Sequence, residues 1–176
     1  MLGGSVELER SPVRSPELVI ASEVLLEYQL AMTDRAAPPP SDPEQGIWRG
    51  RSVARRFVSP DGLTVLVGRS AADNDLLTFG LGESRDAWLH VAAESGSHVI
   101  VRNPDGLERI PRDTLRFAAS LAARYSKAKH GGRVTVHVAT CADVSKPRGF
   151  APGKVELRRF TTIFASPSPP EGERAG

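Results

Sequence analysis

The sequence predicts an α+β fold, a single mixed domain in which pairs of strands pack on one main helix. Three observations indicate it. β-prone runs broken by turn signals fill residues 52–69 and 86–106, an amphipathic helix is expected over residues 111–129, and further β-prone runs follow. The 176 residues, of which 40% are hydrophobic, suffice for one ordinary core.

The first two β-prone regions each predict a pair of strands. Residues 52–69 hold two apolar runs joined by Ser-Pro-Asp-Gly, a hairpin signal. In residues 86–102 aliphatic side chains alternate with bulky polar or aromatic ones. If the aliphatic side chains face the core, the opposite face carries Trp88, His90, His98 and Arg102.

The helix and the last strands complete the domain. Pro111 suits a first helical turn, and Gly131-Gly132 is expected to end the helix after Lys129. Strands are predicted over residues 133–140 and 154–165. One side of the helix is apolar and the other basic, with Arg112, Arg116, Arg124 and Lys127.

Composition divides the chain into three parts. Residues 1–46 are expected to form an acidic helix (15–35) and a proline-rich linker (35–46). Residues 47–166 form the predicted domain, and residues 167–176 have the composition of a flexible tail.

The net charge of +2 hides an asymmetry between these parts. Residues 1–46 hold three arginines against eight acids, whereas residues 47–166 hold nineteen Lys and Arg against eleven acids. The basic side chains concentrate in residues 51–56, on the helix and in residues 146–159, where Phe150 offers a ring on which a base could stack. This pattern favours a polyanionic partner such as RNA.

Several classes of protein are disfavoured. No apolar run is long enough to span a membrane, and no secretion signal is present, so we expect a soluble, cytoplasmic protein. The single cysteine, Cys141, excludes an internal disulfide and a multi-cysteine zinc site. Phosphate-loop, dinucleotide-binding and serine-hydrolase motifs are absent, so no cofactor is expected.

Two alternatives to a non-enzymatic RNA-binding protein stay open. A metal-dependent enzyme that processes nucleic acids could use Asp75, Asp86, His90 and His98, because carboxylate and imidazole bind several metals, although their spacing fits no known metal motif. A protein-interaction adaptor could instead dock a partner on the acidic N-terminal helix.

Five stretches identify a family resemblance. VLVGRSAADNDLLTF, DAWLHV, GSHVIVR, TLRFAASLAARYSKAK and SKPRGFAPGKV occur in this order. Together they resemble the NFACT-R domain, the RNA-binding module of NFACT proteins, which include bacterial RqcH, its fibronectin-binding-protein-A-like relatives and eukaryotic counterparts in ribosome-associated quality control. The resemblance covers residues 47–166, and Ser70 departs from it because the family typically has asparagine there.

The resemblance implies a module that binds tRNA or ribosomal RNA in translation, with the ribosome as partner. Full NFACT proteins carry further domains before this module, so the chain resembles a short, stand-alone NFACT-R protein, without their tailing activity. The basic segments and the resembling stretches together give the candidate RNA-binding residues: Arg69, Asn74, Asp75, Trp88, His90, His98, Arg102, Arg116, Arg124, Lys127, Lys129, Lys146, Arg148, Phe150 and Lys154.

Overall fold

Six strands form one antiparallel sheet in the computed structural model, which describes residues 37–167. The expected N-terminal helix, and with it the proposed adaptor surface, lies outside the described residues, as does the tail after Pro167. The strands follow the order β10-β7-β5-β6-β4-β3 across the sheet. Their bounds are β3 (Ala54–Val58), β4 (Thr64–Gly68), β5 (Ala87–Val91), β6 (Val99–Val101), β7 (Val134–Thr140) and β10 (Thr161–Ala165).

Both predicted strand pairs are present. β3 and β4 form the first hairpin, with Ala54 opposite Gly68. The turn between them places Gly62 at φ +83°, a conformation that glycine adopts without strain. β5 and β6 pair next to each other, with Leu89 opposite Val99.

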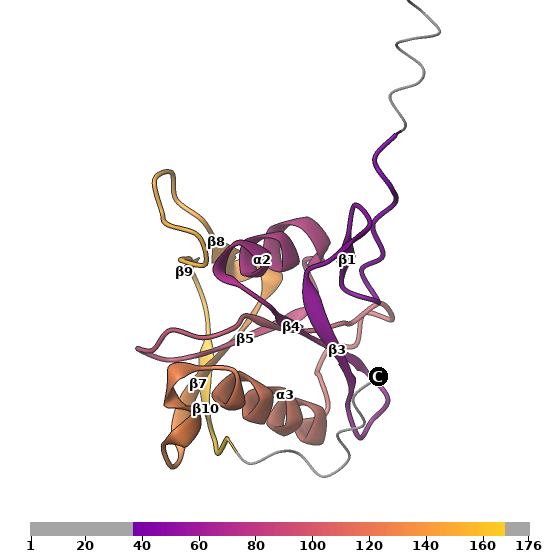
Figure 1. The fold of residues 1–176 in the computed structure, drawn as a ribbon. Coiled ribbons are helices and arrows are strands. Elements are labelled where there is room, and N and C mark those ends of the chain that lie inside the picture. Colours follow the sequence, from indigo (N-terminus) through magenta and orange to yellow (C-terminus); the bar gives the residue numbers. More distant parts are fainter. Residues whose placement is uncertain (1–36, 168–176) are drawn as a thin grey trace, which may run out of the picture. The chain divides into compact units, whose positions relative to one another are not determined.

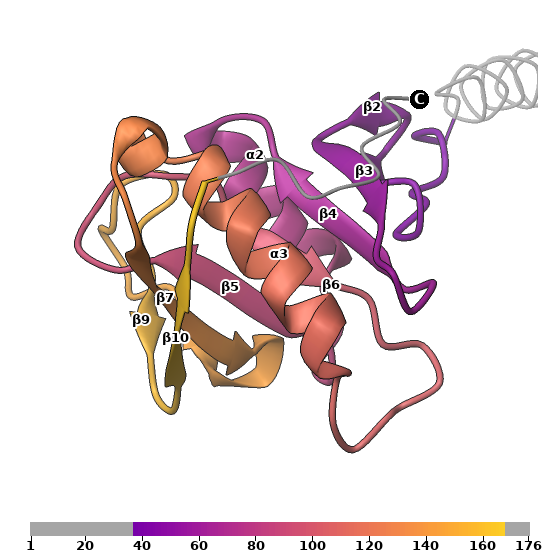
Figure 2. The same ribbon diagram turned by 90° about the horizontal axis from the view of Figure 1, so that it is seen from below.

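The main helix, α3 (Arg112–Arg124), covers one face of the sheet. Figure 2 shows it lying across the strands. Its packing uses small side chains that allow close approach, and the α+β class is confirmed. The core between helix and sheet includes Val65, Val67, Leu89, Val99, Val136, Phe117, Ala118, Leu121 and Ala122.

α3 ends at Arg124 rather than at Lys129, because the residues that follow it pair with the loop that contains Gly96. Ser126 adopts an extended conformation and forms a β-bridge with Gly96. The N–H of Ser97 donates to the Tyr125 carbonyl (3.0 Å). A short 3₁₀ helix, η2 (Lys127–His130), follows, so tertiary hydrogen bonds rather than the glycines end the helix.

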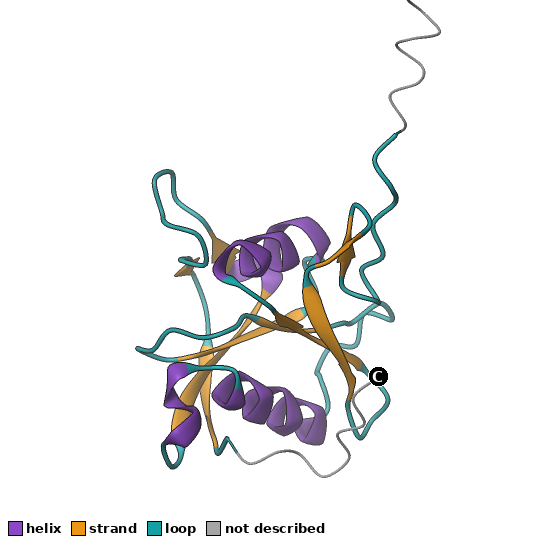
Figure 3. Ribbon diagram, viewed as in Figure 1, coloured by secondary structure: helices purple, strands orange, loops and turns teal. Residues whose placement is uncertain are grey.

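A second helical segment, for which the sequence pattern predicts no element, covers the other face. α2 (Ala71–Asp75) continues into a π-helical turn, η1 (Leu76–Leu81). Figures 1 and 3 show α2 and α3 on opposite sides of the sheet. The start of this helix carries a serine cap, because Ser70 Oγ accepts the N–H of Asp73 (3.2 Å) and donates to the Asp73 carboxylate (2.8 Å).

This helical segment buries the face that carries Trp88. The alternation predicted for β5 and β6 is confirmed, since Trp88 and Ile100 lie on the face away from α3. That face is a second core, in which Trp88 packs with Leu66 and Leu77.

The compact unit that contains the sheet begins at Pro39. Asp42 pairs with Ile47 through two backbone hydrogen bonds (2.8 and 2.9 Å), and Glu44 forms an ion pair with Arg102 (3.0 Å). Two further strand pairs form separate two-stranded sheets: β1 (Ile47–Trp48) with β2 (Arg51–Ser52), and β8 (Val144–Ser145) with β9 (Glu156–Leu157).

The single strand expected over residues 154–165 is divided into β9 and β10. Arg158 and Arg159 interrupt it, because both guanidinium groups turn to the Asp143 carboxylate at 3.0 Å. Within residues 37–167, no helix is long and apolar enough to cross a membrane.

Candidate nucleic-acid interface

Basic side chains gather at one end of the sheet. The strand register places four strand termini at this end of the sheet: the start of β3, the end of β4, the end of β5 and the start of β7. The bridge between Gly96 and Ser126 adds the C-terminus of α3 and η2. We call this set the basic end: Arg51, Arg55, Arg69, Arg124, Lys127, Lys129 and Arg133, with Asp73 and Glu94 as the acids among them.

The opposite end of the sheet is mixed in charge. Its acids and bases alternate along the loops before β5 and α3 and after β7, and several are paired, as Asp143 is with Arg158 and Arg159. Positive charge is therefore concentrated at the basic end, where it can attract phosphates.

The aromatic ring of Tyr125 organises two of these cations. The guanidinium carbon of Arg55 lies 4.9 Å from the ring centroid and that of Arg124 lies 5.9 Å from it. Both distances are within the range of cation–π attraction. Lys127 and Lys129 follow directly and are exposed.

A buried network around His98 holds the basic end together. Asn74 Oδ1 accepts the N–H of His98 (3.0 Å), and its amide group donates to the Gly96 carbonyl (3.2 Å). His98 Nε2 lies 3.1 Å from the Gly153 carbonyl, which can only accept, so Nε2 carries the proton. Nδ1 then accepts from the Thr78 hydroxyl at 2.8 Å.

Burial fixes the charge state of His98. Its side chain is 1% exposed, and burial, with a smaller effect of His90, lowers the pKa of His98 to about 4. His98 is therefore neutral at neutral pH. It positions the loop of Gly153 and offers no charge to a ligand.

The loop between β8 and β9 (residues 146–154) is tied down by this network and by Lys146. Lys146 Nζ lies 3.0 Å from Asp75 Oδ2 and donates to the carbonyls of Ala151 (2.7 Å) and Lys154 (3.3 Å). The N–H of Gly153 donates to Asp75 Oδ1 (3.2 Å). Lys146 thus stabilises the loop, while the exposed side chains near it are Arg148, Phe150 and Lys154.

The structure brings most of the predicted residues to this region, in two different roles. Asn74, Asp75, His98 and Lys146 form the supporting network. His90 is half-buried beside Trp88, with ring centroids 5.8 Å apart. The predicted residues that face solvent at the basic end or on the loop are Arg69, Lys127, Lys129, Arg148, Phe150 and Lys154, with Arg124 partly exposed.

Three predicted residues do not belong to this surface. Trp88 is 1% exposed, so its ring offers no face to a base. Arg102 is 3% exposed at the opposite end of the sheet, where it pairs with Asp86 and with Glu83 (2.8 Å). Arg116 is exposed, but it lies in the first half of α3 near Asp113 (3.4 Å), away from the basic end.

Other cations join the basic end without having been candidates. Arg51 pairs with Asp73 (2.7 Å), Arg55 lies over Tyr125, and Arg133 lies over Phe164 at 4.8 Å. Arg51 and Arg55 belong to a basic segment of the sequence, but no motif marks Arg133. Only the strand register brings these positions together.

The side chains of the metal-site alternative do not converge. Asp86 and His90 lie near opposite ends of β5, and both nitrogens of His98 already have partners. In the described part of the chain, no three His, Cys, Asp or Glu side chains are grouped closely enough to hold a metal. Burial raises the pKa of the Cys141 thiol to about 12, so it is protonated and unreactive.

An α+β fold whose antiparallel sheet carries its cations at one end is typical of a small nucleic-acid-binding module. Residues 54–159 match the family described as the NFACT protein RNA binding domain. The chain belongs to this family, and the resemblance drawn from the five sequence stretches is confirmed.

Relatives of this chain include ribosome quality-control proteins. It is 36% identical over 115 residues to the Rqc2 homolog RqcH of Bacillus subtilis, covering 65% of this chain and 20% of that protein. RqcH of Streptococcus suis is 36% identical over 120 residues, covering 67% and 21%. The Drosophila melanogaster ribosome quality control complex subunit NEMF homolog is 38% identical over 72 residues, covering 41% and 7%.

A solved structure supports the fold. The C-terminal part of the fibronectin/fibrinogen-binding protein from Streptococcus suis superposes with a TM-score of 0.62 at 27% identity, covering 85% of this chain and 56% of that one. The chain thus spans about a fifth of the length of the RqcH proteins it matches.

Proposed function

We propose that this chain is a non-enzymatic, cytoplasmic RNA-binding protein that binds tRNA or ribosomal RNA and associates with the ribosome. The concentration of cations at the basic end is the observation that carries the proposal. Phosphates dominate the affinity of proteins for nucleic acids, and a surface that gathers cations from several separate segments of the chain suits a folded RNA better than an isolated charge would.

The loop of residues 146–154 extends this surface. Its backbone is fixed by Asp75, His98 and Lys146, so Arg148 and Lys154 are presented with little loss of backbone freedom on binding. The names of the relatives place those proteins in ribosome quality control, which supports a role of this chain near the ribosome.

Salt-dependent binding tests the proposal. Purified protein should retain tRNA or ribosomal RNA fragments, and log K should fall linearly with log salt, with a slope of about −4 to −5 if about six phosphates are contacted. Failure to retain either RNA at low salt, or retention that salt leaves unchanged, would refute it. RNA crosslinked to the protein in cells, sequenced beside its sedimentation with ribosomal subunits, identifies the RNA.

The non-enzymatic part has its own measurement. RNA incubated with the protein and added Mg²⁺ or Mn²⁺ should remain intact. Cleavage that Asp75→Asn and His90→Ala abolish would instead support the metal-dependent alternative.

A further inference from the structure

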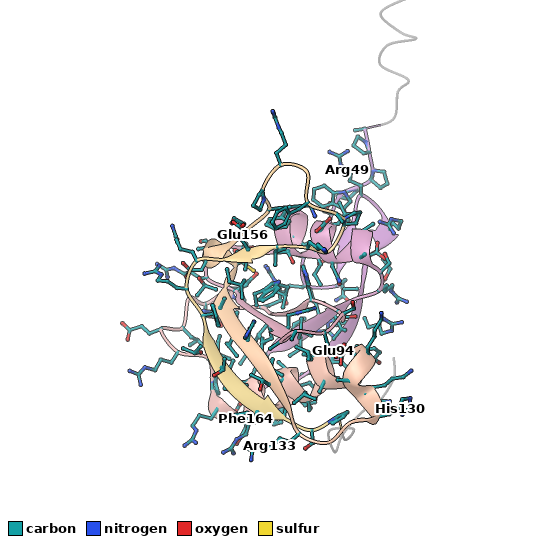
Figure 4. All side chains as sticks on the ribbon, turned by 90° about the vertical axis from the view of Figure 1, so that its left-hand side faces the viewer. Arg49, Glu94, His130, Arg133, Glu156 and Phe164 are labelled. Carbon is teal, nitrogen blue, oxygen red and sulfur yellow. The ribbon has the colours of Figure 1, made fainter. Side chains whose placement is uncertain are left out.

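One half of the sheet face away from α3 carries exposed rings. α2 and η1 pack over β4, β6 and β5 on this face. Along β10, by contrast, Phe164 is 61% exposed, and Phe160 just before the strand is 49% exposed. Figure 4 looks onto β7 and β10 from this side, with Phe164 and Arg133 near the lower end of the strands.

The register places these rings on one surface. Ile163 lies opposite Val136, and both belong to the core against α3. Because side chains alternate along a strand, Phe164 on β10 and His137 on β7 point to the other face. Phe160 joins them, since its ring centroid lies 4.5 Å from that of His137. We call Phe160, His137 and Phe164 the aromatic strip.

The aromatic strip continues from the basic end. Phe164 lies opposite Thr135, near the start of β7, and the guanidinium group of Arg133 lies 4.8 Å from the Phe164 ring centroid. Arg133 therefore belongs to both surfaces. Phe160 is four residues further, about 13 Å along an extended chain, so the strip is long enough to hold more than one base.

We propose that the aromatic strip stacks unpaired bases of an RNA strand whose phosphates bind the basic end. The inference rests on the proposed function and specifies the class of RNA. The RNA has a single-stranded segment next to the phosphates that bind the basic end. Exposed rings next to cations are the combination that holds single strands, because every base has a face that can stack. In a duplex these faces are already stacked on neighbouring pairs, so a duplex gains nothing from the strip.

The cations around the rings favour RNA over a protein partner. Arg133 lies over Phe164, and Lys129 and His130 precede it in η2. Thr162, between the two phenylalanines on β10, is exposed and offers a hydroxyl to ribose or phosphate. Protein–protein interfaces are depleted of lysine relative to the rest of the surface, so Lys129 beside the strip favours RNA.

Substituting the two phenylalanines tests the proposal in the full chain. The probes are a short unstructured oligouridine and a blunt RNA duplex, measured by fluorescence anisotropy. Phe160→Ala and Phe164→Ala should each weaken oligouridine binding by about fivefold or more, while duplex binding stays unchanged. Phe164→Leu should lose affinity like the alanine variant, whereas Phe164→Trp should retain it, because only Trp preserves a flat ring.

Phe79→Ala is the matched control, because Phe79 lies on η1 outside the strip and is 45% exposed. It should leave oligouridine binding unchanged, and circular dichroism of each variant should show an intact fold. Unchanged binding by the double variant Phe160→Ala/Phe164→Ala would overturn the strip while leaving the proposed function intact. Wild-type protein that binds neither probe nor folded RNA would contradict the proposed function itself. If RNA binding survives and self-association is lost in the double variant, the strip is a protein contact and the proposal is wrong.

Discussion

His98 shows how a residue typical of catalytic sites can serve structure alone. Its two ring nitrogens contact Thr78 and the Gly153 carbonyl, and its N–H contacts Asn74. Through its side chain His98 links η1 to the loop of residues 146–154, and through its N–H it contacts α2. The sequence placed this histidine opposite the aliphatic face, but only the helix packed above it explains why it is neutral and buried.

His98 makes folding stability depend on pH. In the unfolded chain it takes up a proton near its ordinary pKa of 6.5, whereas in the folded protein it does so only near a pKa of about 4. Between these values the unfolded state binds more protons, so the free energy of unfolding falls as the pH is lowered. We expect a loss of about 3 kcal/mol between pH 7 and pH 4 from this residue. Burial also lowers the pKa of His90, which acts in the same direction.

Urea unfolding at a series of pH values measures this loss. His98→Gln is the control, since glutamine can donate to Gly153 but does not titrate. This variant should be less stable at neutral pH and show a flatter pH dependence. A wild-type unfolding midpoint that stays constant from neutral pH to about pH 5 would contradict the assignment.

At the scale of elements, the start of α2 depends on one side chain. Ser70 caps the helix by accepting the N–H of Asp73. Serine and asparagine are about equally good caps. Ser70→Ala should therefore lower the free energy of unfolding by about 1 kcal/mol, and Ser70→Asn should leave it nearly unchanged. Chemical denaturation of the three proteins decides this, and equal losses in both variants would show that capping is not the role of Ser70.

The loop of residues 146–154 depends on one lysine for its order. Lys146→Met removes its ion pair with Asp75 and its bonds to Ala151 and Lys154. Because the pair is half-buried, global stability should fall by only about 1 kcal/mol. Trypsin should then cleave after Arg148 several-fold faster, as followed by mass spectrometry. Lys154→Met, an exposed residue in the same loop, is the control and should leave cleavage after Arg148 unchanged.

Elements specified by local signals were predictable, and those specified by distant contacts were not. The β3–β4 hairpin follows from its turn residues, and the packed face of α3 follows from its spacing. The end of α3 depends on a bridge between Ser126 and Gly96, thirty positions earlier in the chain, which local sequence does not reveal. α2 did carry a local signal, the N-cap serine Ser70 with Asp73 three residues later, within a stretch whose glycines and polar residues resemble a loop.

At the scale of the whole molecule, the number of charged residues in the sequence assigns the positive charge to the domain but does not show which surface of the domain carries it. Arg102 and Arg116 seemed equivalent to Lys127 in the sequence, yet the fold buries the first and places the second away from the basic end. The register of the sheet, which no single segment encodes, separates cations that attract phosphate from those that pair with acids.

Matched neutralisation of the two ends tests this separation. Two triple variants are made. The first changes three cations at the basic end to glutamine: Lys127, Lys129 and Arg133. The second changes three arginines near the start of α3 to glutamine: Arg109, Arg112 and Arg116. Both triple variants lose the same charge, so any difference in RNA affinity reports position rather than net charge. The triple variant at the basic end should bind tRNA more weakly. Its slope of log K against log salt should be shallower by about 2, because each lost phosphate contact lowers the magnitude of that slope by about 0.7 to 0.9.

The second triple variant should change the slope little. If both variants lose affinity and slope equally, binding responds to the net charge of the molecule and the basic end has no special part in it. A larger loss in the second variant would move the interface to the N-terminal half of α3. Only a selective loss in the first agrees with a phosphate-binding surface made by the strand register.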